Sequence, residues 1–177
     1  MKKIKIPLQN SFLFESEKFQ DERGYFMETW NQEKFGLTAF VQDNHSKSIQ
    51  GVLRGLHYQI EPKSQGKLVR CTQGIVYDVI VDLRKYSSTF GKWFGIELKR
   101  PELHLWVPPG MAHGFYTLSK HSEVQYKVTN YYDPLYERVL KWNDSQIGIT
   151  WPFNKDPIIS YKDFNNSKTF ENCHKFV

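Results

Sequence analysis

The sequence predicts an all-β fold, a jelly-roll barrel (double-stranded β-helix) with a few short helices. Aromatic residues make up 16% of the chain, with thirteen Phe and ten Tyr, a composition that favours strands over helices. Strand-like runs recur at intervals of about 8 to 12 residues, separated by Gly and Pro turns, which is typical of a sandwich or barrel. We expect one domain, residues 1–177, with a polar tail from about residue 165.

The first part of the chain predicts short strands and one helix. Residues 4–19 alternate loosely and predict one or two strands, followed by a turn at residues 21–24 that ends in a glycine. Residues 25–30 predict the next strand. Asn31 is expected to cap a short helix over residues 32–35, which a glycine then ends.

The central part predicts the longest strands. Residues 40–46 begin apolar and become polar, as expected of a strand whose end binds a polar ligand. Residues 53–59 and a run that opens at Lys67 follow, and residues 75–83 show the clearest alternation. That alternation places Asp78 among aliphatic side chains. A buried carboxylate needs a partner, and we expect Lys67 or Arg54 to supply it.

The last part predicts further strands near residues 93–99 and 103–107 and a strongly alternating one over residues 123–131. From residue 140 onward we expect short strands and loops. Beyond residue 164 the polar tail has little to pack, so it is expected to be frayed or to wrap a neighbouring molecule.

Charge and composition exclude several classes of protein. The chain has 24 basic and 19 acidic residues, a net charge of +5, without a run of like charges. We interpret this as mild attraction for anions, including phosphorylated small molecules. No nucleic-acid-binding motif accompanies the charge, so no nucleic acid partner is expected.

The sequence also indicates the compartment. No run approaches 18 apolar residues, so no membrane partner is expected. A signal peptide is not expected either, because the polar residues 7–10 precede any apolar stretch. Cys71 and Cys173 have no spacing typical of metal or redox sites and are expected to be free thiols, as in the cytoplasm.

Three cationic or titratable residues mark a candidate active site. Arg54, His57 and Lys67 lie within 14 residues on what read as neighbouring strands, where a purely structural strand carries more apolar residues. They could supply a phosphate clamp, a proton acceptor and a fixed cation around one pocket. Strict alternation puts Arg54 and His57 on opposite faces of their strand, so we expect a β-bulge at Gly55.

A metal site is an alternative for the same barrel. The run Pro108-x-Gly110-x-x-His113 resembles the second half of the cupin metal signature. The first half is missing, because His57 stands alone and is followed by Lys67, whose ammonium group would repel a divalent cation. No metal is therefore expected.

Seven blocks of sequence, in order across about 150 positions, resemble the dTDP-4-dehydrorhamnose 3,5-epimerase family. They are Asp21-x-Arg23-Gly24-x-Phe26-x-Glu28, Gln42-Asp43-Asn44-His45-Ser46, Leu53 to Gln59, Gln65 to Val69, Ala112 to Phe115, Tyr126-Lys127 and Trp142 to Asp144. The resemblance implies a jelly-roll homodimer, no cofactor, and a dTDP-4-keto-6-deoxy sugar as substrate on the route to dTDP-L-rhamnose.

The resemblance also implies catalytic roles, and the chemistry suits the residue types. Protons next to a C4 ketone can be removed if the enolate oxygen is stabilised, which Lys67 is expected to do. Inversion needs removal from one face and return on the other: His57 matches the family's base and Tyr126 its acid. Asp163 matches the carboxylate that orients His57.

Substrate-binding residues carry over in the same way. Arg23 and Arg54 resemble the pyrophosphate contacts, and Tyr132 resembles the platform on which thymine stacks. Arg54 could also serve across the dimer interface. The other residues that match positions used for the nucleotide sugar, with His113 on the sugar itself, are Phe26, Glu28, Gln42, Asp43, Asn44, His113, Glu137 and Lys162.

Related activities share this scaffold. A 3- or 5-epimerase, or a 3,4-ketoisomerase, would use the same base, and the match at Tyr126 favours inversion over isomerisation. A non-catalytic sugar-nucleotide-binding barrel would have no need of His57, Tyr126, Lys67 and Asp163 together, and all four are present.

Overall fold

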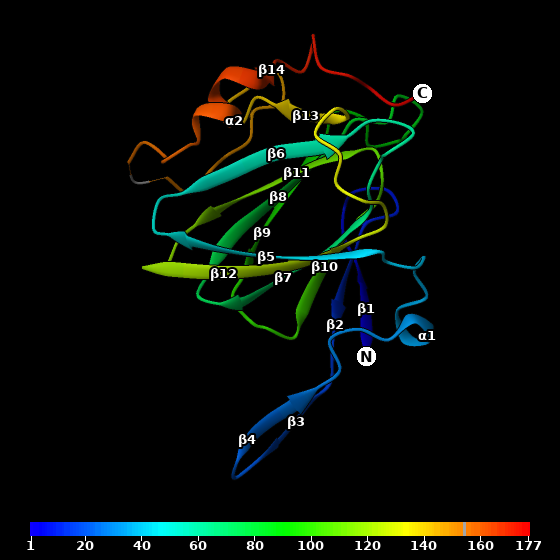
Figure 1. The fold of residues 1–177 in the computed structure, drawn as a ribbon, viewed down its shortest axis with the longest axis vertical. Coiled ribbons are helices and arrows are strands. Elements are labelled where there is room, and N and C mark those ends of the chain that lie inside the picture. The colour runs from blue at the N-terminus through cyan, green and yellow to red at the C-terminus, as the bar shows by residue number, and fades with distance from the viewer. Residues whose placement is uncertain (154) are drawn as a thin grey trace.

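Two six-stranded sheets form the body of the molecule in the computed structural model, which describes residues 1–153 and 155–177. The first sheet has the order β1 (Lys2–Lys5), β2 (Phe12–Glu15), β10 (Leu103–Val107), β7 (Lys67–Gln73), β12 (His121–Val128) and β5 (Gln42–Ile49). The second has the order β14 (Ser167–Lys168), β13 (Glu137–Leu140), β6 (Leu53–Gln59), β11 (Met111–Thr117), β8 (Val76–Asp82) and β9 (Trp93–Leu98). Figure 1 shows the two layers. This arrangement confirms the predicted jelly roll.

The two sheets pack through their inner faces. Strand alternation sends Val69, Ile80, Leu105 and Val124 into one buried cluster between them, each with no exposed surface. Several strand limits match the prediction, including the whole of β6 and β10 and the start of β7. Strand β12 ends three residues earlier than predicted, at Val128.

A short helix, α1 (Gln32–Phe35), forms at the predicted residues. It lies on the outer side of the first sheet. The Asn31 side chain accepts a hydrogen bond from the Lys34 N–H at 3.2 Å, and Gly36 ends the helix with φ 60°. Phe35 packs against Phe14, a residue of β2. The helix therefore covers apolar side chains that β2 turns away from the barrel interior.

The C-terminal tail is docked, so the expectation that it is frayed is wrong. Phe170 and Cys173 are each only 6% exposed and pack, with Phe176, on the outer face of β8. Strand β14 pairs in parallel with β13, and the Phe176 N–H donates to the Leu83 carbonyl at 3.0 Å. The tail is polar in composition, but its few apolar residues share one buried face.

A second helix, α2 (Tyr161–Asn166), precedes the tail where the sequence predicted only short strands and loops. Ser160 caps it, because its Oγ accepts from the Asp163 N–H at 3.1 Å. Figure 1 shows α2 beside β13 and β6. Within the described residues, neither helix is long and apolar enough to cross a membrane.

A hairpin formed by β3 (Lys18–Asp21) and β4 (Gly24–Met27) projects away from the barrel (Figure 1). The sequence predicted the turn but extended the second strand to Trp30. Phe26 is 68% exposed on this hairpin. Its register partner Phe19 and its neighbour Tyr25 are also more than half exposed, and clustered exposed apolar side chains of this kind mark an interaction surface.

Candidate active site

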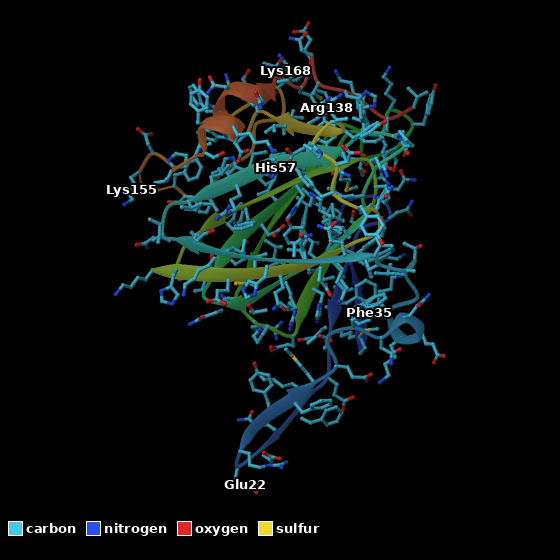
Figure 2. The ribbon with its side chains drawn as sticks, viewed as in Figure 1. Glu22, Phe35, His57, Arg138, Lys155 and Lys168 are labelled. Carbon is cyan, nitrogen blue, oxygen red and sulfur yellow. The ribbon has the colours of Figure 1, made fainter. Side chains whose placement is uncertain are left out.

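A cavity of about 280 Å³ opens between the two sheets near β6 and β12. Seven of the residues selected from the sequence line it: Gln42, Asn44, His57, Lys67, Tyr126, Tyr132 and Glu137. Because β6 belongs to one sheet and β12 to the other, His57 and Tyr126 approach the cavity from opposite walls. Figure 2 shows His57 within the barrel layers, on β6.

The predicted β-bulge in β6 sets the direction of His57. His57 and Arg54, three residues apart, pair with His113 and Phe115, which are only two apart on β11. Gly55 adopts φ 121°, and a Cβ there would lie 2.6 Å from the Gly114 Cα. The extra residue in β6 therefore needs glycine.

Asp163 holds the His57 ring. The His57 Nε2 lies 2.7 Å from the Asp163 Oδ1, and the Gly55 N–H donates to the other carboxylate oxygen at 3.4 Å. Burial alone would raise the pKa of Asp163, but the hydrogen bonds from His57, Gly55 and Ser160 outweigh it and lower this pKa. The ionised carboxylate accepts the Nε2–H, which leaves Nδ1 with a lone pair able to take a proton.

Lys67 places a cation beside this base. Its side chain is 7% exposed, and its Nζ donates to the His57 carbonyl at 3.2 Å. Burial lowers the pKa of Lys67 to about 8, against the opposing charges of Glu137 and Asp78. The ammonium group is thus the charged form at neutral pH and is suited to stabilise a developing oxyanion.

Tyr126 faces the cavity from β12, next to its register partner Asn44 on β5. Burial raises the pKa of Tyr126, while the nearby charge of Arg54 partly opposes the increase. The phenol therefore keeps its proton at neutral pH and can donate it.

Three residues form a polar cluster at the mouth of the cavity. The Tyr132 hydroxyl donates to Glu137 at 3.2 Å, and the Lys162 Nζ donates to both Glu137 and the Tyr132 hydroxyl. The bond with Glu137 raises the pKa of Lys162. Since Lys162 precedes Asp163 on α2, this cluster also ties α2 to β13 beside the base.

His113 has a different environment from the one expected. It is 6% exposed, its Nε2 lies 3.0 Å from both oxygens of Asp78, and it is not among the described residues that line the cavity. The prediction that Lys67 or Arg54 is the partner of Asp78 is therefore wrong, because the hydrogen bond to Asp78 comes from His113. The sequence could not indicate this pair, because it depends on β8 and β11 being neighbours.

Several predicted substrate contacts lie outside the cavity. Arg54 donates to the Ser48 Oγ at 2.9 Å and to the Lys47 carbonyl at 3.1 Å. Asp43 points to the other face of β5, where Lys127 donates to it at 2.8 Å. The other contacts outside, Arg23, Phe26 and Glu28, lie on or just after the projecting hairpin. Figure 2 shows Glu22 at the tip of the hairpin, well away from the body of the barrel in which His57 lies.

Three cavity residues were not selected from the sequence: Tyr58, Gln59 and Gln65. The Gln59 amide donates to the Tyr131 carbonyl at 3.1 Å and accepts from the Asp133 N–H at 2.8 Å, which holds the loop that carries Tyr132. Gln59 lies two residues after His57, on the same face of the strand. This spacing is the signal that could have found it.

Within residues 1–153 and 155–177, no group of three or more His, Cys, Asp or Glu side chains is arranged to hold a metal ion.

The fold and the cavity together define a class of protein: a jelly-roll enzyme with a carboxylate-held histidine, a buried lysine and a protonated tyrosine, the groups needed for proton transfer next to a carbonyl. Comparison with known proteins identifies the family. The family model described as dTDP-4-dehydrorhamnose 3,5-epimerase matches residues 5–171.

Individual relatives agree. The dTDP-4-dehydrorhamnose 3,5-epimerase of Shigella flexneri is 51% identical over 174 residues, 95% of this chain and 96% of that one. The crystal structure of the enzyme from Elizabethkingia anophelis superposes with a TM-score of 0.92 at 47% identity, covering 97% of each chain. A dTDP-6-deoxy-D-glucose-3,5-epimerase from Legionella pneumophila, solved in complex with dTDP-4-keto-L-rhamnose, gives a TM-score of 0.92 at 40% identity over 98% of this chain and 94% of that one.

The chain belongs to the dTDP-4-dehydrorhamnose 3,5-epimerase family and is an enzyme of the isomerase class. The resemblance found in the sequence is thereby confirmed.

Proposed function

We propose that His57, Lys67, Tyr126 and Asp163 carry out the 3,5-epimerisation that defines this family, converting dTDP-4-dehydro-6-deoxy-D-glucose to dTDP-4-dehydro-L-rhamnose. The observation that carries the proposal is the placement of the His57–Asp163 pair and Tyr126 on opposite walls of one cavity, with Lys67 between the sheets. A single wall of titratable groups could exchange a proton but could not invert a carbon.

Each inversion uses two proton transfers. His57, through the nitrogen that Asp163 leaves free, removes the proton from C3 or C5, and the C–H electron pair moves toward the C4 carbonyl. Lys67 stabilises the negative charge on that oxygen. Tyr126 returns a proton to the opposite face of the same carbon, and the carbonyl is restored. His57 then releases its proton to solvent and Tyr126 regains one from solvent, after which the same set acts at the other carbon.

Recognition of the nucleotide extends the site beyond one chain in this proposal. Arg23 and Phe26 are exposed on the projecting hairpin, and within the described residues they do not line the cavity of their own molecule. We therefore propose that the enzyme is a homodimer in which the hairpin of one protomer reaches the cavity of its partner. Arg23 would contact the diphosphate and Phe26 the nucleoside, beside Tyr132.

A cytoplasmic location is also part of this proposal. Cys71 and Cys173 are both free and buried, which supports a reducing compartment.

The test of the reaction is proton NMR of dTDP-4-keto-6-deoxyglucose with the purified protein in deuterated water. The proposal expects deuterium at both C3 and C5, and none with His57→Ala. Exchange at one carbon would replace it with a single-carbon epimerase, and no exchange at either carbon would refute the assignment of substrate.

The test of the shared site is subunit mixing. Arg23→Ala and His57→Ala homodimers should each have little activity. After random reassociation, half of the dimers are mixed and carry one intact site, so about a quarter of the wild-type activity should return. No recovery would mean that Arg23 acts within its own chain, and an active Arg23→Ala homodimer would mean that Arg23 has no role.

A further inference from the structure

Asp78 is a fully buried carboxylate on the inner face of β8, and among the described residues His113 is its one hydrogen-bond donor. We propose that Asp78, which lies outside the substrate cavity, is a positioning residue: together with His113 it supplies a fixed negative charge that keeps the Lys67 side chain cationic and directed at the substrate oxygen. The inference rests on the proposed role of Lys67 as the cation that stabilises the enolate.

The first support is the position of the pair. Asp78 has no exposed surface, and it lies between the inward-facing core residues Val76 and Ile80 on β8. His113 stands directly opposite His57 in the pairing of β11 with β6. The pair therefore occupies the inner face of the second sheet, where residues of β8 pack with Val69 and Cys71 of β7 in one buried cluster. The Lys67 Nζ donates to the carbonyl of His57, the register partner of His113.

The second support is a comparison with Asp82, four residues along the same strand and equally buried. Asp82 accepts hydrogen bonds from the Arg84 backbone N–H, its guanidinium group, Ser87 and Thr89. In the part of the chain that the structure describes, Asp78 has one donor, the His113 Nε2, shared by both oxygens at 3.0 Å. Its negative charge is thus much less compensated than that of a carboxylate with a purely structural role.

The third support is that this charge reaches β7. The Asp78 carboxylate opposes the loss of the Lys67 proton that burial favours. Burial, and Asp78 in addition, raise the pKa of Cys71, on the same face of β7, to about 11. Both effects are the expected action of a poorly compensated buried anion on groups across a narrow interior.

The other groups around Lys67 differ from Asp78 in position or in charge. Glu137, on β13, acts on Lys67 in the same direction and more strongly, but it lies at the mouth of the cavity, where Lys162 and Tyr132 engage it. Facing Lys67, His57 on β6 is held by Asp163 on α2, and Tyr126 on β12 keeps its proton. His113 on β11 and Arg54 on β6 add no negative charge. Asp78 is therefore the fixed anion on the side of Lys67 away from the cavity mouth.

The experiment compares pH profiles of kcat/KM for the wild type, Asp78→Asn and the matched control Asp82→Asn. Asparagine keeps an oxygen that can accept from His113. The expected result is that Asp78→Asn moves the alkaline limb about one pH unit toward acid, so activity at pH 8 falls about fivefold while activity at pH 6 stays within about twofold. Asp82→Asn should lower thermal stability and leave the limb in place.

A second measurement follows the titration of Lys67 without relying on the proposed reaction. Cyanate labels only the neutral amine, so the pH dependence of carbamylation at Lys67, followed by mass spectrometry, reports its titration directly. In Asp78→Asn the labelling midpoint should move toward acid by the same amount as the limb. An unchanged midpoint overturns the inference, whatever the rate profile does.

If the midpoint moves but the kcat/KM limb does not, Asp78 tunes Lys67 without a catalytic consequence. That outcome overturns the positioning role and locates the failure in the function proposed for Lys67. If Asp78→Asn does not fold, Asp78→Thr serves in its place, because threonine keeps an oxygen acceptor for His113 and favours strands. The labelling midpoint of Lys67 and the alkaline limb of kcat/KM are then compared between the wild type and Asp78→Thr, with the same expectations.

Discussion

Two His–Asp pairs lie side by side in the barrel, and their surroundings differ. His57 is partly exposed at the cavity, and its carboxylate partner comes from α2, more than a hundred residues away. His113, its direct neighbour on β11, is buried and takes its carboxylate from the adjacent strand β8. The same two residue types can thus form a base at one place and a fixed charge at another. The two pairs differ in access to the cavity and in the element that supplies the carboxylate, α2 for one and β8 for the other.

The largest effect is expected from breaking the first pair at its histidine. His57→Asn removes the proton acceptor without a large change in volume, so kcat should fall by roughly 10³-fold or more. Deuterium exchange at C3 and C5 should disappear with it. The thermal midpoint should change little, because His57 is not fully buried. Exchange that continues at either carbon would mean that another group removes that proton.

The carboxylate of the same pair should matter less than the histidine. In Asp163→Asn the amide can donate as well as accept, so the tautomer of His57 is no longer fixed, and we expect kcat to fall by about 10²-fold. Ser160→Ala is the control for the helix, because it removes the cap of α2 but leaves the Asp163 carboxylate bonded to His57 and Gly55, and it should cost about 1 kcal/mol of local stability. Equal losses in both variants would show that Asp163 acts only by anchoring α2.

A variant of Tyr126 tests whether catalytic groups act from both sides of the cavity. Tyr126→Phe keeps the ring but removes the proton donor, so product formation should slow by about 10- to 100-fold. Deuterium exchange should persist, since His57 still removes and returns protons on its own face. The measurement is the ratio of exchange to inversion by NMR. If both decline together, Tyr126 acts in binding and not as the acid.

The sequence predicted the fold because strand limits depend on local signals. Glycine turns and alternation located β6, and an asparagine cap with a following glycine located α1. The tail and α2 were missed because their stability is not local. Helix α2 has six residues and depends on the Ser160 cap and on contacts of Asp163 with β6. Phe170 and Cys173 become core residues only once the outer face of β8 exists.

The candidate site also combines features that have a local sequence signal with features that depend on tertiary contacts. His57, Lys67 and Tyr126 were selected because their blocks of sequence resemble a family, and Asp163 because it matches that family's carboxylate. The structure adds where these residues lie around the cavity. The pairing of His113 with Asp78 had no local signal, because the two residues are 35 positions apart and meet only through strand neighbours. The placement of Arg23 away from the cavity likewise depends on the direction in which the hairpin leaves the barrel.

The smallest effect concerns Lys67, which lies near both His–Asp pairs, His57 with Asp163 and His113 with Asp78. Its pKa of about 8 means that activity should fall about tenfold per unit as pH rises above 8, because the cation is lost. Stability should change in the opposite direction. In the unfolded chain the lysine keeps its proton up to its ordinary pKa of 10.5, so between pH 8 and 10.5 the unfolded state binds more protons than the folded state, and the free energy of unfolding rises with pH. Denaturant unfolding at several pH values measures this slope, and Lys67→Met, with its side chain uncharged throughout, should lack this contribution. A wild type and Lys67→Met with parallel stability profiles would show that the folded protein does not depress the Lys67 pKa.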